Sequence, residues 1–307
     1  MKTLVLSMIS IAATVAAMTA CTSESDGIDD LTKEAKVEIN ATAGIGEIIT
    51  KTAGVVNQGE AMDDIGFVRV DKADPITDWS AETLLDIPAT MTEAGVISFT
   101  PTQYFDSQKT VYTNMIGYHP KASFTRTKNT IAYQITGQED IMCTVPVKKN
   151  KEDASMTFSF DHLLTQFTFL IAAENAEAAK AWGNVTSIDL INQKTSATLT
   201  LDTKEIVFAA PATGIIPVGS TSTPFTTSDV TQTLQFGSSI MVEANQSEYK
   251  VNVKTVNNPG GVDIALSVKN AVVSTSYVVT LTFKGTTIVP TATIGKWLPE
   301  TGSGEVI

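Results

Sequence analysis

The chain has 307 residues, a hydrophobic content of 43% and a formal net charge of -12, which leaves room for two domains of ordinary size. The acidic charge argues against nucleic acid as a partner, because phosphate binding needs a basic surface. Two Cys and two His are too few for a Cys/His zinc site, so neither a metal nor another cofactor is expected.

Residues 1–20 have the pattern of an export signal. Lys2 precedes an uncharged apolar run from Leu4 to about Ala17, which is too short for a usual membrane span. The segment Met18-Thr19-Ala20-Cys21 resembles the lipobox of bacterial lipoproteins, in which the Cys becomes the acylated first residue. We therefore predict a lipoprotein signal peptide over residues 1–20 and lipidation, palmitate included, at Cys21. An ordinary signal peptide cut near an A-x-A site is the alternative.

Residues 21–35 are predicted to be an acidic tether. Cys21 is followed by Thr-Ser-Glu-Ser-Asp-Gly-Ile-Asp-Asp, which lacks the apolar side chains that packing requires. Such a run resembles the surface-export signal of Bacteroides-type lipoproteins, and a solvated linker is the alternative. Both interpretations place the start of the folded part near residue 36.

A first strand is expected at residues 37–41, where Val37, Ile39 and Ala41 share one face. A polar loop that contains Lys51 follows it. Cys143 lies in an alternating stretch without a cationic neighbour, so we predict a buried small hydrophobic residue rather than a reactive thiol.

Period-two alternation continues through the second half of the chain and predicts further strands. A short helix is expected at residues 174–182, where Ala and Glu are frequent, and Gly183 ends it. The predicted strand faces are Met156-Phe158-Phe160, Ala197-Leu199-Leu201, Tyr249-Val251-Val253, Val262 to Val268 and Tyr277 to Phe283, with a hairpin turn at residues 257–261.

The predicted fold class is all-β. We expect two tandem transthyretin-like or Greek-key β-sandwich domains with a short connector helix. The N-terminal sandwich is assigned to residues 36–155, with a first strand removable up to about Lys51, and the C-terminal sandwich to residues 156–307. Faces this regular indicate antiparallel sheets with one side in the core.

No motif of an enzyme is present, and no enzymatic activity is expected. The sequence lacks a nucleophile elbow, a phosphate loop and a zinc-protease helix. His119 and His162 are interpreted as structural residues. Residues 298–302 match the sortase pentapeptide LPxTG, but without the apolar span and basic tail that wall anchoring needs, so the match is interpreted as coincidence.

Several motifs, taken in order, resemble the fimbrillin family, the Bacteroides-type lipoprotein pilins of type V pili (Mfa-like or FimA-like). The order of the motifs carries the resemblance more than any one of them. They are Cys21 with its acidic run, the first strand leading to Thr50-Lys51-Thr52, Asp64-Ile65-Gly66-Phe67-Val68, Phe158-x-Phe160-x-His162-x-Leu164, and Ile294-Gly295-Lys296-Trp297.

The resemblance implies a structural subunit or tip adhesin of a cell-surface pilus (fimbrium) that supports adhesion and biofilm formation. Fimbrillins are exported as outer-membrane lipoproteins and cut by a trypsin-like protease. The cut frees the first strand and opens a groove, which a strand of another subunit fills by donor-strand exchange. Lys51 stands where the family usually has Arg, and Lys36 is the alternative cut site. The released strand would carry Val37, Ile39 and Ala41.

The implied partners are other fimbrillin subunits, in a homo- or hetero-polymer, and a trypsin-like processing protease. Outer-membrane lipid is implied for the precursor, and a host or bacterial surface ligand for an adhesin. The competing hypothesis is a monomeric surface lipoprotein that binds glycan or a host protein through its loops. Both place the chain at the cell surface.

Overall fold

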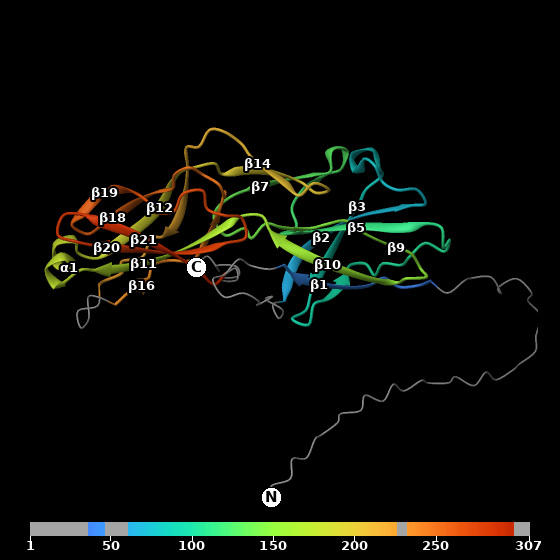
Figure 1. Ribbon diagram of the computed structural model, residues 1–307, viewed down its shortest axis with the longest axis horizontal. Coiled ribbons are helices and arrows are strands. Elements are labelled where there is room, and N and C mark those ends of the chain that lie inside the picture. The colour runs from blue at the N-terminus through green and yellow to red at the C-terminus, as the bar shows by residue number, and fades with distance from the viewer. Residues whose placement is uncertain (1–35, 47–60, 226–231, 298–307) are drawn as a thin grey trace, which may run out of the picture. The chain divides into compact units, whose positions relative to one another are not determined.

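The computed structural model describes residues 36–46, 61–225 and 232–297, which belong to one compact unit. Strands dominate it, as Figure 1 shows. Those of the first half are β1 (Asn40–Ile45), β2 (Met62–Lys72), β3 (Leu85–Met91), β4 (Val96–Phe99), β5 (Tyr112–His119), β6 (Phe124–Thr125), β7 (Thr130–Gln134), β8 (Met142–Thr144), β9 (Val147–Lys149) and β10 (Ser155–His162), with short 3-10 helices η1 (Trp79–Ala81) and η2 (Arg126–Lys128).

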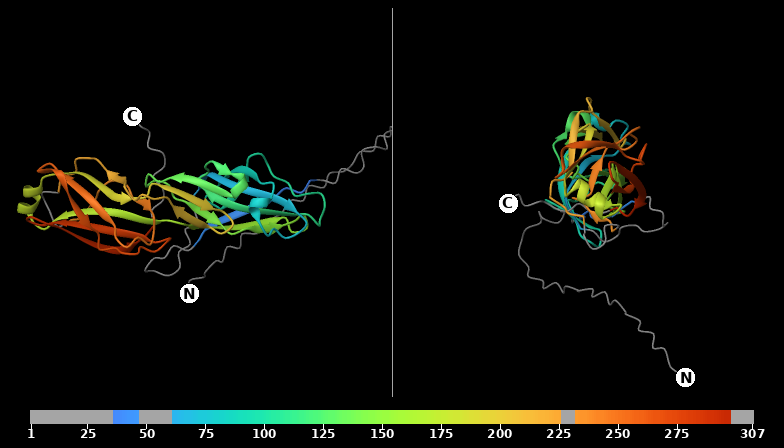
Figure 2. Two further views of the ribbon diagram at one scale, coloured as in Figure 1. Left: turned by 90° about the horizontal axis from the view of Figure 1, so that it is seen from above. Right: turned by 90° about the vertical axis from the view of Figure 1, so that its left-hand side faces the viewer.

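The second half holds the α-helix α1 (Ala176–Trp182) and the remaining strands. Figure 2 shows α1 at one end of these strands, which are drawn in yellow to red. They are β11 (Thr165–Ala173), β12 (Val185–Gln193), β13 (Ser196–Thr200), β14 (Glu205–Phe208), β15 (Gly214–Gly219), β16 (Leu234–Gln235), β17 (Ile240–Val242), β18 (Lys250–Thr255), β19 (Asn258–Ala265), β20 (Ser276–Phe283) and β21 (Ile288–Gly295).

The strand pairing of the first half closes on itself. Its sheet has the order β2-β3-β4-β1-β10-β8-β5-β9, and β2 also pairs with β5. Seven strands from β2 through β1 and β10 to β5 therefore form a ring of paired strands, which we call the β1 ring. A closed ring has no free edge, and β1 is the strand that joins β4 to β10.

The β1 ring encloses a core of its own. Because side chains alternate along a strand, every second residue points inward, and those positions are apolar. The inward residues include Ile39 just before β1, Ala41 and Ile45 of β1, Ile65 and Phe67 of β2, Ile87, Ala89 and Met91 of β3, Ile97 of β4, Met115 of β5, Met142 of β8, and Met156, Phe158 and Phe160 of β10.

A larger core fills the second half and extends onto the outside of the β1 ring. Val68 and Val70 of β2 belong to this core, whereas Ile65 and Phe67 face into the ring, so β2 is buried on both faces. The sheets around this core have the orders β16-β11-β20-β21, with β17 also paired to β11, then β15-β12-β18-β19 and β14-β13-β7-β6.

The all-β sandwich fold predicted from the sequence is confirmed, as is the connector helix. Asn175 caps α1 by accepting a hydrogen bond from the N–H of Ala178, and the helix ends at Gly183. The hairpin turn is shorter than predicted, because β18 ends at Thr255 and β19 already begins at Asn258. Among the described residues, no helix has the length and apolar character needed to cross a membrane.

Two pairings differ from the expected antiparallel arrangement. β1 runs parallel to β10, and β11 runs parallel to β20, each pair joined by a long crossover. β10 follows the predicted domain boundary in sequence but pairs with β1 and β8, and β7 pairs with β13. The division into residues 36–155 and 156–307 stays a prediction.

Candidate functional site

The first strand forms because its inward positions are apolar. Ile39 and Ala41 are each 4% exposed and Ile45 is 5% exposed, while Asn40 and Thr42 face the solvent. The alternation extends beyond the predicted residues 37–41, since β1 runs from Asn40 to Ile45 and Glu38 forms an isolated bridge with Tyr104. β1 thus contributes a complete stripe of side chains to the core of the β1 ring.

The two neighbours of β1 hold it unequally. β10 pairs with it in parallel over six residue pairs, from Asn40↔Ser155 to Ile45↔Phe160. β4 pairs with it at only two positions, Ala41↔Ile97 and Thr42↔Val96. The side of β1 that faces β10 is therefore the firmer one.

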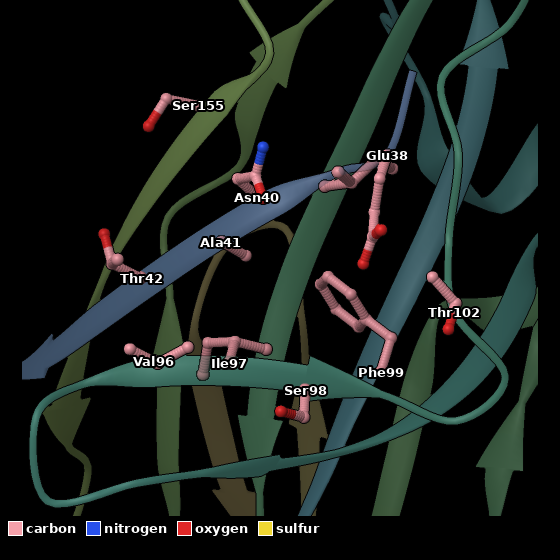
Figure 3. A pocket seen from close by; sticks show the side chains of 11 residues that line it. Glu38, Asn40, Ala41, Thr42, Val96, Ile97, Ser98, Phe99, Thr102 and Ser155 are labelled. Carbon is pink, nitrogen blue, oxygen red and sulfur yellow. The ribbon is translucent and has the colours of Figure 1, made fainter. Parts of the chain in front are cut away.

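Beyond those two pairs, β4 moves away from β1 and leaves a cavity of about 440 Å³. Figure 3 shows the two strands together at Thr42 and Val96 and apart at Glu38 and Phe99. The cavity is lined by both polar and apolar residues of β1, β4 and the segments beside them, among them Phe99. The seam between β1 and β4 is thus open along part of its length.

The pairing resumes at the start of β1, where residues 103–105 lie beside it. The N–H of Ile39 donates to the carbonyl oxygen of Gln103 over 2.9 Å, and the N–H of Phe105 donates to that of Val37 over 2.9 Å. The buried Arg69 fixes this segment, since its guanidinium donates to Gln103 Oε1 over 2.8 Å and to the carbonyl oxygen of Tyr104 over 2.7 Å. This role of Arg69 has no local signal in the sequence, because Gln103 and Tyr104 lie more than thirty residues away.

A glycine marks the end of β1. The N–H of Gly46 donates to the carbonyl oxygen of Phe160. A Cβ atom at this position would lie 2.3 Å from Oδ1 of Asp161 and 3.2 Å from the carbonyl oxygen of Phe160, so a larger residue would require the Asp161 side chain to move. A strand with glycine one position after its last inward residue therefore fits this place without moving Asp161.

Aromatic rings form the floor under β1. Phe67 contacts Phe99, Phe158 and Phe160 edge to face, with centroid distances of 5.2, 4.9 and 6.2 Å. If β1 were absent, this apolar floor and the unpaired edges of β4 and β10 would be exposed together. Such a surface favours the binding of another strand.

Both histidines of the chain hold Asp140. Nδ1 of His162 donates to Asp140 Oδ1 over 2.7 Å, and Nδ1 of His119 donates to the carbonyl oxygen of Asp140 over 3.0 Å. Asp140 Oδ2 accepts a hydrogen bond of 3.1 Å from Nε1 of Trp297, whose ring stacks on His162 with a centroid distance of 4.1 Å. The sequence pattern predicted structural histidines but not that Asp140 joins them to Trp297.

Two of the predicted site residues, Cys21 and Lys51, lie outside the described residues. Lys36 is exposed, with its ammonium 5.6 Å from the ring centroid of Tyr104. Val37 is half-buried beside Ile39 and Ala41. The structure therefore brings the predicted strand residues together on the core-facing side and leaves Lys36 in solvent.

Cys143 is fully buried, as predicted. Burial raises the pKa of its thiol to about 12. Its Sγ lies 3.6 Å from the carbonyl oxygen of Leu201, to which it donates. This environment stabilises the neutral thiol and opposes the thiolate that a nucleophile would need.

Comparisons with known proteins identify the fold and the family. A family model described as fimbrillin-like matches residues 50–297. A crystal structure of a candidate cell adhesion protein from Bacteroides uniformis superposes with a TM-score of 0.61 at 18% identity, covering 86% of this chain and 98% of the other. One from Bacteroides ovatus gives 0.59 at 18% identity, covering 87% and 100%. These likenesses establish the fold, and no curated protein matches.

Proposed function

Because the chain belongs to the fimbrillin-like family, we propose that it is a structural subunit or tip adhesin of a cell-surface pilus. In this proposal the precursor is an outer-membrane lipoprotein acylated at Cys21. A protease then frees β1, and a strand of another subunit takes its place in the β1 ring. The names of the two structures of similar fold refer to cell adhesion, which supports a surface role.

The position of β1 in the ring carries the proposal. β1 completes the core of the β1 ring and pairs with the edges of β4 and β10. In the sequence, residues 47–60, which contain Lys51, connect β1 to β2. A cut in that segment would leave β1 held only by hydrogen bonds and packing. Its departure would open the ring between β4 and β10, and the exposed groove would bind a strand of matching pattern.

The last strand of the chain has such a pattern. The inward face of β1 and the residue before it reads Ile39-x-Ala41-x-Ala43-x-Ile45, followed by Gly46. One face of β21 has the same spacing of large and small residues, followed by the same glycine. It reads Ile288-x-Pro290-x-Ala292-x-Ile294, followed by Gly295. We therefore propose β21 as the donor strand.

Pro290 makes this fit slightly weaker than that of β1. Pro290 would take the place of Ala41. The N–H groups of Ile39 and Ala43 donate to the carbonyl oxygens of Gln103 and Gly95, so that of Ala41, midway between them, points to the same side, toward β4. Proline has no N–H to donate, so the donor would form one hydrogen bond fewer. The apolar face and the glycine after it are retained.

Proteolysis followed by size-exclusion chromatography tests the proposal. The mature chain treated with a trypsin-like protease is expected to lose its first strand by cleavage after Lys51 and to form a ladder of multimers. Lys51→Ala is expected to stay monomeric, while Lys36→Ala, the matched control in exposed chain before β1, is expected to assemble like the wild type. Assembly of Lys51→Ala at the wild-type rate would exclude Lys51 as the switch.

The donor is tested separately with Ile294→Asp, which places a charge on the inward face of β21. Processed Ile294→Asp is expected to accept a strand but not to donate one, so adding it to processed wild-type protein should shorten the multimers. The control Thr293→Asp changes the exposed face. If Ile294→Asp entered long multimers as well as Thr293→Asp does, β21 would not be the donor.

A further inference from the structure

β21 is an edge strand whose end is anchored by one large side chain. Among the described strands it pairs only with β20, over eight residue pairs. Its outward residues Val289, Thr291 and Thr293 are exposed. Trp297, two residues after the strand, is 2% exposed and belongs to the larger core. To leave its place, β21 must first withdraw this indole.

The binding site of Trp297 is built by the first half of the chain. Asp140 accepts the hydrogen bond from Nε1, and the imidazole of His162 lies against the ring at an interplanar angle of 32°. Asp140 and His162 are themselves buried and joined by a hydrogen bond of 2.7 Å. The cluster therefore has one component just after β21, Trp297, and the others on β10 and the loop before β8.

His162 is the last residue of β10, the strand to which β1 is most firmly paired. β1 lies along Ser155 to Phe160 on one side of β10, and β8 holds residues 160–162 on the other. The hydrogen bond from Gly46 to Phe160 ends two residues before His162. Loss of β1 would leave β10 with β8 as its one paired neighbour among the described strands.

The closed cluster contains one buried polar atom without a hydrogen bond. Nε2 of His162 is buried and has no hydrogen-bond partner among the described residues. A buried nitrogen without a partner favours any conformation in which water can reach it. The position of the imidazole against Trp297 therefore depends on the strand that carries it.

We infer that Trp297, Asp140 and His162 form a latch on β21 that stays closed only while β1 lies beside β10. This inference rests on the proposed function, because it states what controls the release of β21, the proposed donor strand. In the unprocessed chain the latch keeps β21 paired with β20. Removal of β1 loosens β10 and the latch, so a subunit offers its own donor strand only after its groove is open.

Hydrogen–deuterium exchange of the β21 amides tests the latch, in the full mature chain at a concentration where it stays monomeric. Trp297→Phe retains an aromatic ring but loses the Nε1–H donor and is expected to speed exchange in β21 at least tenfold, with β3 and β18 unchanged. Asp140→Asn, which disturbs the same cluster from the other side, is expected to act in the same direction. Trp79→Phe, a buried indole outside the latch, is the control and should leave β21 unchanged.

Cleavage at Lys51 tests the coupling to β1. Loss of β1 is expected to speed exchange in β21 to a similar extent, and Trp297→Phe should then add less than twofold, because the latch is already open. Equal β21 exchange in Trp297→Phe and wild type would overturn the latch. Unchanged β21 exchange after loss of β1 would overturn the coupling even if multimers form. Faster exchange without multimers at high concentration would support the latch and contradict the proposed function.

Discussion

At the residue scale, close approaches between strands depend on residues without a Cβ atom. Gly66 of β2 lies under the ring of Tyr118 in β5, and a Cβ atom there would be 2.1 Å from the ring. Tyr118 is fully buried, and its hydroxyl donates to Asp86 over 2.7 Å, so the ring has no room to move. The contact between β2 and β5, which closes the β1 ring, therefore requires glycine.

Gly66→Ala is expected to lower the free energy of unfolding by about 1–3 kcal/mol, because the added methyl group overpacks the β2–β5 contact. Gly285→Ala is the matched control, since a Cβ atom there meets nothing within 4 Å. Urea titration of both variants measures the difference. Equal midpoints would show that Tyr118 can shift at no cost.

Cys143 makes the fold sensitive to alkaline pH. Burial raises the pKa of the thiol from its ordinary value of 9.0 to about 12, so the folded state keeps a proton that the unfolded state releases. The contribution of the thiol is fully present below pH 9 and is lost as the pH rises toward 12. In protein carrying Cys21→Ser, a thiol reagent at pH 8 is expected to label Cys143 only after denaturation. Rapid labelling of the native protein would contradict the burial of this thiol.

At the element scale, β1 combines a buried face with weak pairing to one neighbour. Its apolar stripe contacts the aromatic floor of the ring, while the seam with β4 is interrupted by the cavity. The packing of its apolar side chains therefore holds β1 in place more strongly than its hydrogen bonds to β4 do.

Ile45→Ala is expected to lower the free energy of unfolding by about 2–5 kcal/mol, since it deletes buried carbon atoms at the end of β1. Thr42→Ala, on the exposed face of the same strand, is expected to change it by less than about 0.5 kcal/mol. Thermal or urea unfolding of the unprocessed chain distinguishes the two. Similar losses would mean that hydrogen bonding rather than packing retains β1.

The sequence predicted elements better than their partners. Alternation is a local property, so β10, β13 and β20 could be located from their own side chains. β1 was placed too early, because Ala43 and Gly44 have weak strand propensity and conceal its second half.

The partners could not be predicted because pairing depends on contacts between residues far apart in the chain. Nothing in residues 40–45 indicates that they run parallel to residues 155–160. The role of Arg69 beside Gln103 and that of Asp140 between His162 and Trp297 arise only when the strands are assembled. Each of these residues has an ordinary local sequence.

At the scale of the whole molecule, acidic charge opposes association. Like-charged subunits repel each other over about 10 Å at 0.1 M salt, and added salt screens this repulsion. The whole chain has a formal net charge of -12, and cleavage after Lys51 removes four lysines and seven acidic residues, so a processed subunit keeps a charge of -9. Such subunits are expected to assemble several-fold faster at about 0.5 M than at about 0.02 M sodium chloride. Light scattering after cleavage measures the initial rate. Slower assembly at high salt would indicate that attraction between opposite charges guides the encounter.

The place of β1 between a parallel and an antiparallel neighbour has a mechanical consequence. Hydrogen bonds between strands lie across the strand direction. A tensile force along a strand in this groove would load the bonds to β10 and β4 together, rather than break them one after another as in a zipper. A donor strand in the same place would be strained in shear, the direction in which a sheet resists force best. A filament built this way would bear tension along its axis without a covalent bond between its subunits.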